Sequence, residues 1–79
     1  MDDDLIHFEV FARRNEAASM TLELATEDRA RAMEFAEELL EKKAVAVRVT
    51  KEIRDPDSGE YRSVTILAKG SPEKKRSKA

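Results

Sequence analysis

The feature that most limits the fold of this chain is a change in the spacing of its apolar residues. Apolar and polar side chains alternate from Leu5 to Arg13 and from Met20 to Ala25, as they do in half-buried strands. The same alternation returns from Val45 to Ile53 and from Tyr61 to Lys69. The spacing therefore predicts four strands, with a segment of different period between the second and the third.

That middle segment, residues 27–43, has the spacing of an amphipathic helix. Thr26 is the predicted N-cap, because its hydroxyl can accept a hydrogen bond from a free backbone N–H group. Acidic residues follow in the first turn and lysines fill the last turn, which suits the helix dipole. The side chains expected on the apolar face are Ala32, Met33, Phe35, Ala36, Leu39 and Leu40.

Strands this close in sequence pair most simply as antiparallel hairpins. We therefore predict an α+β fold of order ββαββ: a four-stranded, mainly antiparallel sheet with one helix packed on one face. The run AVAVRV is the most apolar, so the third strand is placed centrally and the predicted strand order is 2-1-3-4. Residues 1–69 form the single domain, and residues 70–79 are expected to be a disordered basic tail or linker.

The segment Asp55–Glu60, DPDSGE, is the part of the chain that most resembles a ligand-binding loop. Pro56 presets φ at the first position of a turn, and Gly59 supplies a residue at positive φ. Closing a hairpin here sets Val49 opposite Ile66, and polar residues of the two strands opposite each other. A calcium loop of the EF-hand type needs about twelve residues between two helices. The segment is therefore interpreted as a turn, and no metal site is predicted.

The composition limits where in the cell the protein is expected to be. The chain has no Cys, which excludes disulfides and thiolate zinc sites. No apolar run approaches the roughly 20 residues that span a bilayer. The first residues, MDDD, are acidic where a secretory signal would be basic. We expect a cytoplasmic protein that does not bind membranes.

Few residues suggest catalysis. The single histidine, His7, shares a strand face with Glu9, but no Ser lies at a recognisable nucleophile position. The two glycines, Gly59 and Gly70, do not form a phosphate-binding loop. We expect no enzyme activity, no catalytic residues and no cofactor, and no small-molecule site is evident.

The sheet face away from the helix carries the best candidates for an interface. Aromatic side chains on an uncovered face are typical anchors in protein interfaces. A small open sheet also leaves two strand edges free. We therefore predict a non-enzymatic protein-interaction or oligomerisation module, whose partner is another protein or a second copy in a homodimer. The predicted interface residues are Phe11, Arg13, Arg48, Tyr61 and Leu67.

Single-stranded RNA or other nucleic acid is the alternative partner. Arginines interleaved with aromatic residues on an open sheet are typical of RNA-binding sheets, and the lysines and arginine after Gly70 could contact phosphates. That tail has a net charge of +3, so the remainder of the chain carries −5 of the total of −2. A nucleic-acid platform is expected to be basic, which makes this partner the less favoured one.

The helix EDRARAMEFAEELLEKK followed by AVRVTKEIRDPDSGEYRSVTILAKG resembles small uncharacterised bacterial domains. Such domains sometimes stand at the start of longer chains. The resemblance spans roughly residues 5–70 and carries no motif for an activity. It implies a bacterial, cytoplasmic protein in which this segment is the N-terminal domain of a longer chain.

Overall fold

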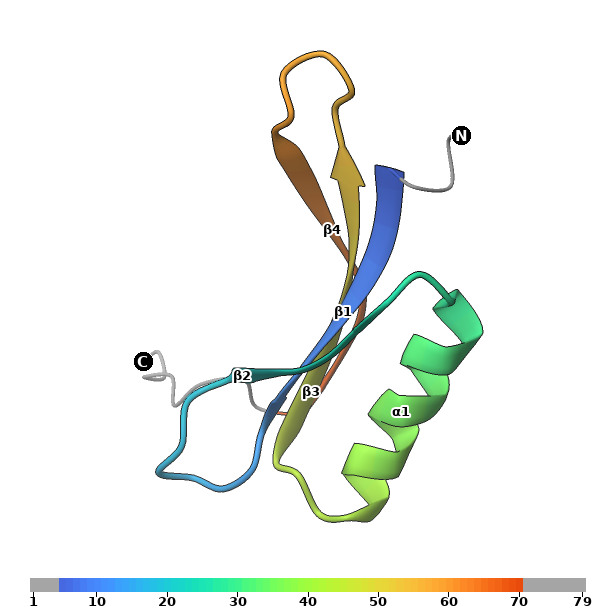
Figure 1. Ribbon diagram of the computed structural model, residues 1–79. Helices are drawn as coiled ribbons and strands as arrows, with labels where there is room; N and C mark the ends of the chain where they lie inside the picture. Colours follow the sequence, from blue (N-terminus) through green and yellow to red (C-terminus); the bar gives the residue numbers. More distant parts are fainter. Residues whose placement is uncertain (1–4, 71–79) are drawn as a thin grey trace.

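The computed structural model describes residues 5–70 of the 79-residue chain. One antiparallel sheet of order β2-β1-β3-β4 carries a single helix, so the predicted α+β class and strand order are confirmed. Of the predicted tail, Gly70 is the last residue of β4, and residues 71–79 lie outside the described range. In chain order the elements are β1 (Ile6–Arg13), β2 (Thr21–Thr26), α1 (Arg29–Glu41), β3 (Ala46–Arg54) and β4 (Tyr61–Gly70) (Figure 1).

The core lies between α1 and the two central strands. Val10 of β1 is opposite Val49 of β3, and both are fully buried. The helix contributes Leu39 and two alanines that are fully buried, and alanines let the helix axis come close to the sheet. Figure 1 shows that the β3–β4 hairpin extends past the N-terminal end of α1, so the helix covers only part of its side of the sheet.

The helix starts two residues later than the sequence suggested. Thr26 remains in β2, paired with Phe8 of β1, and its hydroxyl accepts from the Asp28 N–H at 3.1 Å. Asp28 is the N-cap, and its carboxylate accepts from the Arg31 N–H at 3.1 Å. The predicted Thr26 cap is therefore wrong, because sheet pairing holds that residue in the strand.

The C-terminal end of α1 closes with a Schellman motif. Ala44 N–H donates to the Leu39 carbonyl at 3.1 Å, and Lys43 N–H donates to the Leu40 carbonyl at 3.0 Å. This geometry puts Lys43 at φ 72°, a region that glycine prefers. The motif directs Ala44 toward the core cluster, against which it packs. The same turn leaves the backbone of Lys43 strained.

The hairpin loop has the predicted form. Asp55 N–H donates to the Glu60 carbonyl at 2.8 Å, Gly59 N–H donates to the Asp55 carbonyl at 2.8 Å, and Gly59 has φ 78°. Thr50 lies opposite Thr65, as the loop register requires. The prediction of a hairpin closed by a turn at this loop is confirmed.

Both edge strands contain one extra residue, a β-bulge. In β2 the pairing moves from Leu24 opposite Val10 to Leu22 opposite Phe11, which leaves Glu23 unpaired. In β4 it moves from Thr65 opposite Thr50 to Leu67 opposite Val49, which leaves Ile66 unpaired. The predicted pairing of Val49 with Ile66 is therefore wrong by one residue.

Candidate interaction surface: the open face and the edge of β4

The open face, defined here as the sheet surface opposite α1, follows from strand alternation. Phe8, Val10 and Ala12 of β1 are buried in the core cluster that the helix completes, so the residues between them point the other way. Cross-strand pairing extends this surface to β3 and β4. Its central residues are His7, Glu9 and Phe11 of β1, Arg48, Thr50 and Glu52 of β3, and Ser63 and Thr65 of β4.

Phe11 and Arg48 form a stacked pair on the open face. They lie opposite each other in β1 and β3, and the Arg48 guanidinium carbon is 5.0 Å from the centre of the Phe11 ring. Both residues are partly buried. This cation–π contact confirms that the two predicted interface residues share a face, and it also occupies the aromatic surface that a ligand would stack on.

Arg13, another predicted interface residue, has a structural role. It is only 2% exposed, its Nε donates to the Ala18 carbonyl at 2.9 Å, and one Nη donates to the Glu16 carbonyl at 2.6 Å. These bonds hold the loop between β1 and β2 in place. The side chain is therefore buried in its own domain, contrary to the predicted exposure.

Leu67 lies on the helix side of the sheet, because the bulge at Ile66 reverses the alternation in β4. It is opposite Val49, which is fully buried, and it packs against the core cluster. The prediction that Leu67 is on the open face is therefore wrong.

Tyr61 is on the open face and is 57% exposed, the highest value among the large hydrophobic residues of the described range. Its ring meets the His7 ring edge-on at 5.6 Å. His7 in turn lies with its Nε2 2.9 Å from a Glu9 carboxylate oxygen. These contacts orient the tyrosine and leave more than half of its surface free.

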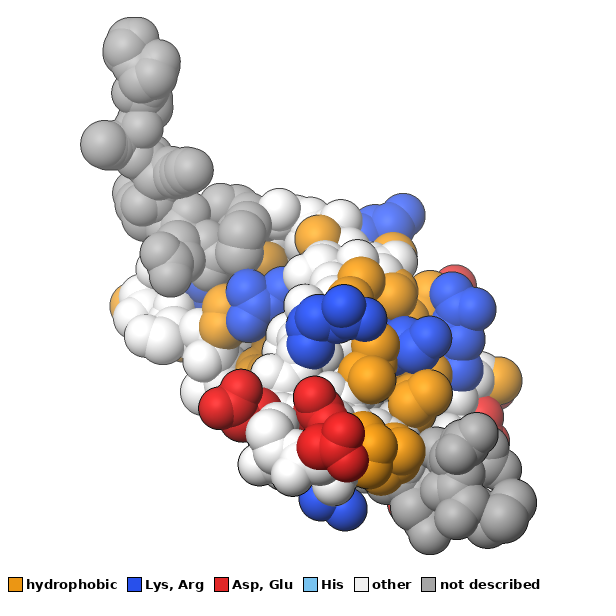
Figure 2. Space-filling view, turned by 90° about the horizontal axis from the view of Figure 1, so that it is seen from above, with side chains coloured by type: hydrophobic (Ala, Val, Ile, Leu, Met, Phe, Trp, Pro, Cys, Tyr) orange, Lys and Arg blue, Asp and Glu red, His pale blue; other side chains and the backbone are white. Residues whose placement is uncertain are grey.

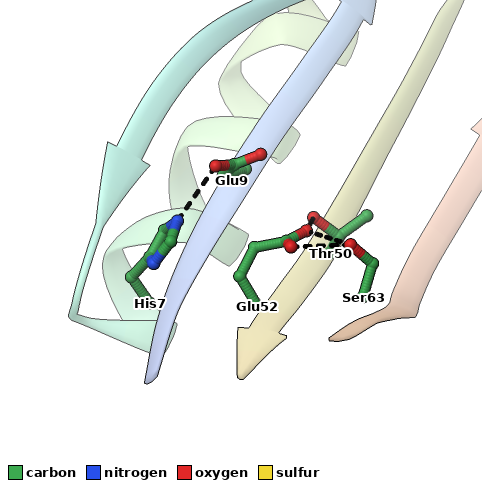
Figure 3. Close-up of polar contacts among 5 residues, drawn as sticks. All are labelled: His7, Glu9, Thr50, Glu52 and Ser63. Atoms are coloured by element: carbon green, nitrogen blue, oxygen red, sulfur yellow. Dashed lines mark hydrogen bonds and ion pairs between the residues drawn. The ribbon is translucent and has the colours of Figure 1, made fainter. Parts of the chain in front are cut away.

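A buried carboxylate lies at the centre of the open face. Glu52 is 8% exposed and accepts hydrogen bonds from the Thr50 hydroxyl at 2.7 Å and the Ser63 hydroxyl at 2.6 Å (Figure 3). Glu52 lies opposite Ser63, which agrees with the predicted pairing of polar residues, but the sequence does not indicate that the carboxylate is buried. The sequence signal for this cluster was the spacing of Thr50 and Glu52, which are two residues apart on one strand face, with Ser63 predicted on the neighbouring strand.

The hydrogen bonds keep this carboxylate ionised. Burial raises the pKa of Glu52 and is the largest single influence, but the bonds from Ser63 and Thr50, together with the charge of His7, outweigh it. The net result is a pKa below the ordinary value of 4.5. The open face thus contains a fixed negative charge tied to the edge strand.

The outer edge of β4 is the longest exposed backbone surface among residues 5–70. Tyr61–Gly70 has 10 residues, and all of them are exposed or only partly buried. Ser63–Ala68, SVTILA, carries no charge and is rich in β-branched residues. Exposed edges of this composition readily pair with another strand.

The hairpin end of the sheet also exposes apolar and cationic side chains. Val64, on the helix side but beyond the helix, is 42% exposed. Figure 2, the view from above, shows hydrophobic side chains gathered beside Lys and Arg side chains. A shallow hollow of about 450 Å³ lies at the loop, and its lining includes Tyr61, two arginines and three acidic residues: Arg54, Arg62, Asp55, Asp57 and Glu60.

Within residues 5–70, no group of three or more His, Asp or Glu side chains is arranged to hold a metal ion. The single helix in that range is too short and too polar to cross a membrane.

No protein family, curated protein or solved structure matches this chain, so the resemblance to small bacterial domains stays a prediction.

Proposed function

We propose that this chain is a protein-interaction domain that binds an extended segment of a partner along the outer edge of β4. The observation that carries the proposal is the exposure of β4 along its whole length, with no strand of the described range beside its outer edge. Strand addition of this kind uses main-chain hydrogen bonds for affinity and side chains for specificity.

The side chains beside this edge suit a protein ligand. Tyr61 exposes an aromatic surface on the open face, and Val64 exposes an aliphatic one on the opposite face. Arg62, between them, is the one charged residue in the stretch from Tyr61 to Ala68. An added strand with alternating apolar residues would meet one of these surfaces on each face.

Of the predicted interface residues, the proposal retains Tyr61 and sets two others aside. Arg13 holds a loop and Leu67 packs against the core, so neither is free to bind a partner. Phe11 and Arg48 lie on inner strands and are stacked on each other, so a partner that extends from the edge across the open face would reach only the parts of them that stay exposed.

Nucleic-acid binding has weaker support. The acidic residues before Leu5 and the basic tail cancel, so residues 5–70 have a net charge of −2. The open face also carries two acidic residues, Glu9 in β1 and the ionised Glu52 in β3. A phosphate backbone would be repelled there.

The polar cluster supports a binding role rather than catalysis. The Ser63 hydroxyl donates to Glu52, a carboxylate, and His7 bonds Glu9. Nucleophilic catalysis needs the hydroxyl to donate to a base that then accepts its proton, as histidine does in hydrolase triads. The arrangement stabilises a charge and gives the serine no such activation.

A peptide-selection experiment tests the proposal. A library of random twelve-residue peptides is selected on the dilute protein, and a selected synthetic peptide is titrated while amide NMR shifts are followed. We expect binding that changes little between about 50 and 200 mM salt, with the largest shifts at Tyr61, Ser63 and Thr65.

A matched pair of variants locates the binding. Thr65→Pro removes a backbone N–H from the outer edge, and Thr65→Val keeps that N–H while removing the hydroxyl. We expect the proline variant to lose the peptide and the valine variant to keep it. Failure to select any peptide, or equal binding by both variants, would overturn strand addition, and steep salt dependence with single-stranded RNA would replace it.

A further inference from the structure

We infer that the strand accepted by β4 is the β4 of a second copy, paired antiparallel about a two-fold axis at Ser63. The inference rests on the proposed function, because it names the partner for the same edge. Two observations carry the inference. One is the set of β4 backbone groups that point away from β3, and the other is the length of β4 between the hairpin loop and the bulge.

The loop fixes which residues of β4 face β3. Asp55 N–H donates to the Glu60 carbonyl, so this is a hydrogen-bonded pair. Hydrogen-bonded and non-hydrogen-bonded pairs alternate along an antiparallel ladder. The backbone groups of Arg62 and Val64 therefore point toward β3, and those of Tyr61, Ser63 and Thr65 point outward.

The three residues whose backbone groups point outward are centred on Ser63. They are bounded on one side by the loop residue Glu60 and on the other by the bulge at Ile66, where regular pairing with β3 is interrupted. Ser63 lies midway between Tyr61 and Thr65. A second copy turned by 180° about Ser63 would thus present its own three outward residues in the matching register.

In this register every outward N–H and C=O between Tyr61 and Thr65 has a partner. Ser63 lies opposite the second copy's Ser63, and Tyr61 lies opposite the second copy's Thr65. An aromatic residue opposite a β-branched one is a favourable cross-strand pair. The chain therefore supplies a matching strand for its own edge.

Charge is compatible with the same register. Arg62, the single charge in the paired segment, falls opposite the second copy's Val64 and not opposite another arginine. The apolar stem of Arg62 can then cover the exposed valine. Like charges placed directly opposite each other would have opposed the pairing.

The symmetry also fixes the shape of the assembly. A two-fold axis perpendicular to the sheet keeps each face on its own side, so the four-stranded sheet would double in width with both helices on one face. In each copy the Glu52–Ser63 bond points from β4 toward β3, so the two carboxylates would lie on opposite sides of the axis, one strand away from it.

Sedimentation equilibrium of the full chain tests the inference over a range from micromolar to millimolar concentration. We expect a reversible shift from the 9.0 kDa chain to twice that mass. Thr65→Pro should remain a monomer at a concentration where Thr65→Val is a dimer, and circular dichroism should show both variants folded.

Cysteine crosslinking tests the register, because the chain has no cysteine of its own. Only residue 63 faces itself across the axis, at about 5.5 Å between Cα atoms, which is within the range of a disulfide. Ser63→Cys should therefore form a covalent dimer under mild oxidation faster than Val64→Cys. Equal rates, or faster coupling at residue 64, would overturn the axis at Ser63.

The outcomes separate this inference from the proposed function. A chain that stays monomeric at millimolar concentration, yet binds a selected peptide through Thr65, would overturn the second copy and keep the edge. A dimer that persists in Thr65→Pro would place the interface elsewhere and overturn the inference. If Ser63→Cys does not fold, crosslinking of Tyr61→Cys with Thr65→Cys in a mixed sample replaces it, since those residues face each other.

Discussion

The Ser63 hydroxyl in β4 lies 2.6 Å from the Glu52 carboxylate in β3, so the exposed edge strand is bonded directly to a buried negative charge. Glu52 also accepts from Thr50 of its own strand. Both hydroxyl donors satisfy an anion that would otherwise be costly to bury. The position of the edge and the ionisation of Glu52 are therefore linked.

This link predicts how stability depends on pH. The pKa of Glu52 is lower in the folded protein than its ordinary value of 4.5. The carboxylate thus contributes stability that is fully present above pH 4.5 and is lost as pH falls through the folded pKa. Urea unfolding midpoints measured from pH 7 down to about 3 should decrease accordingly.

Glu52→Gln is the control for that measurement. The amide is neutral at every pH, so the variant should be less stable at pH 7 and its stability should fall less between pH 5 and pH 3. The pKa of Glu23 is also lowered, by its bond with Arg14, so some dependence should remain. An unchanged pH profile would contradict the role given to Glu52.

The C-terminal cap of α1 predicts a stabilising substitution. Lys43 is at φ 72°, where a side chain costs roughly 1 kcal/mol relative to glycine. Lys43→Gly should therefore raise the free energy of unfolding by about 1 kcal/mol. Lys42→Gly is the matched control, because Lys42 has φ −89° and glycine there should destabilise the helix end. Thermal unfolding of both variants gives the comparison.

The two glycines of the chain should respond differently to alanine. Both have positive φ, but a Cβ at Gly59 would meet nothing within 4 Å, whereas a Cβ at Gly70 would lie 2.2 Å from the Val45 carbonyl oxygen. Gly59→Ala should cost about 1 kcal/mol from backbone strain alone. Gly70→Ala should cost roughly 2–4 kcal/mol, because the backbone must also move. Chemical denaturation would contradict this if the two costs were equal.

Leu39 anchors the helix to the sheet. It is 4% exposed in the core cluster, whereas Leu22 of β2 is 53% exposed. Leu39→Ala should destabilise the protein by about 2–5 kcal/mol, and Leu22→Ala should change stability little. Similar losses in the two variants would show that Leu22 has a packing role that its exposure does not suggest.

The sequence predicted the order of elements, the strand order and the hairpin loop, because alternation, helical spacing and turn residues are local signals. It did not predict the bulges at Glu23 and Ile66, since alternation alone assigns Leu22 to the face of Leu24 and Leu67 to the open face. A bulge depends on which residue lies opposite across the sheet. The bulge in β4 affected the predicted interface more than the predicted fold, because the one extra residue moves Leu67 from the open face to the helix side of the sheet.

Burial of Arg13 was missed for a related reason. An arginine at the end of a strand is usually exposed, but the loop after β1 folds its carbonyls back onto this side chain. The two shorter bonds go to backbone carbonyls, of Glu16 and Ala18, and the side chains of those residues do not reveal them, although the Glu16 carboxylate also lies 3.4 Å from Arg13. Only the three-dimensional path of the loop shows the bond.

That loop yields the last prediction. Arg13 donates from Nε and Nη2 to two different carbonyls, at 2.9 and 2.6 Å, a fork that a lysine ammonium does not reproduce. Arg13→Lys should therefore destabilise the protein by about 1–3 kcal/mol, because a buried charge loses hydrogen bonds.

Arg14→Lys is the control: Arg14 is exposed beside Glu23, and lysine can keep that ion pair. Urea unfolding together with amide exchange in residues 14–20 measures both effects. Faster exchange in Arg13→Lys alone is the expected result, and equal behaviour of the two variants would contradict the role assigned to Arg13.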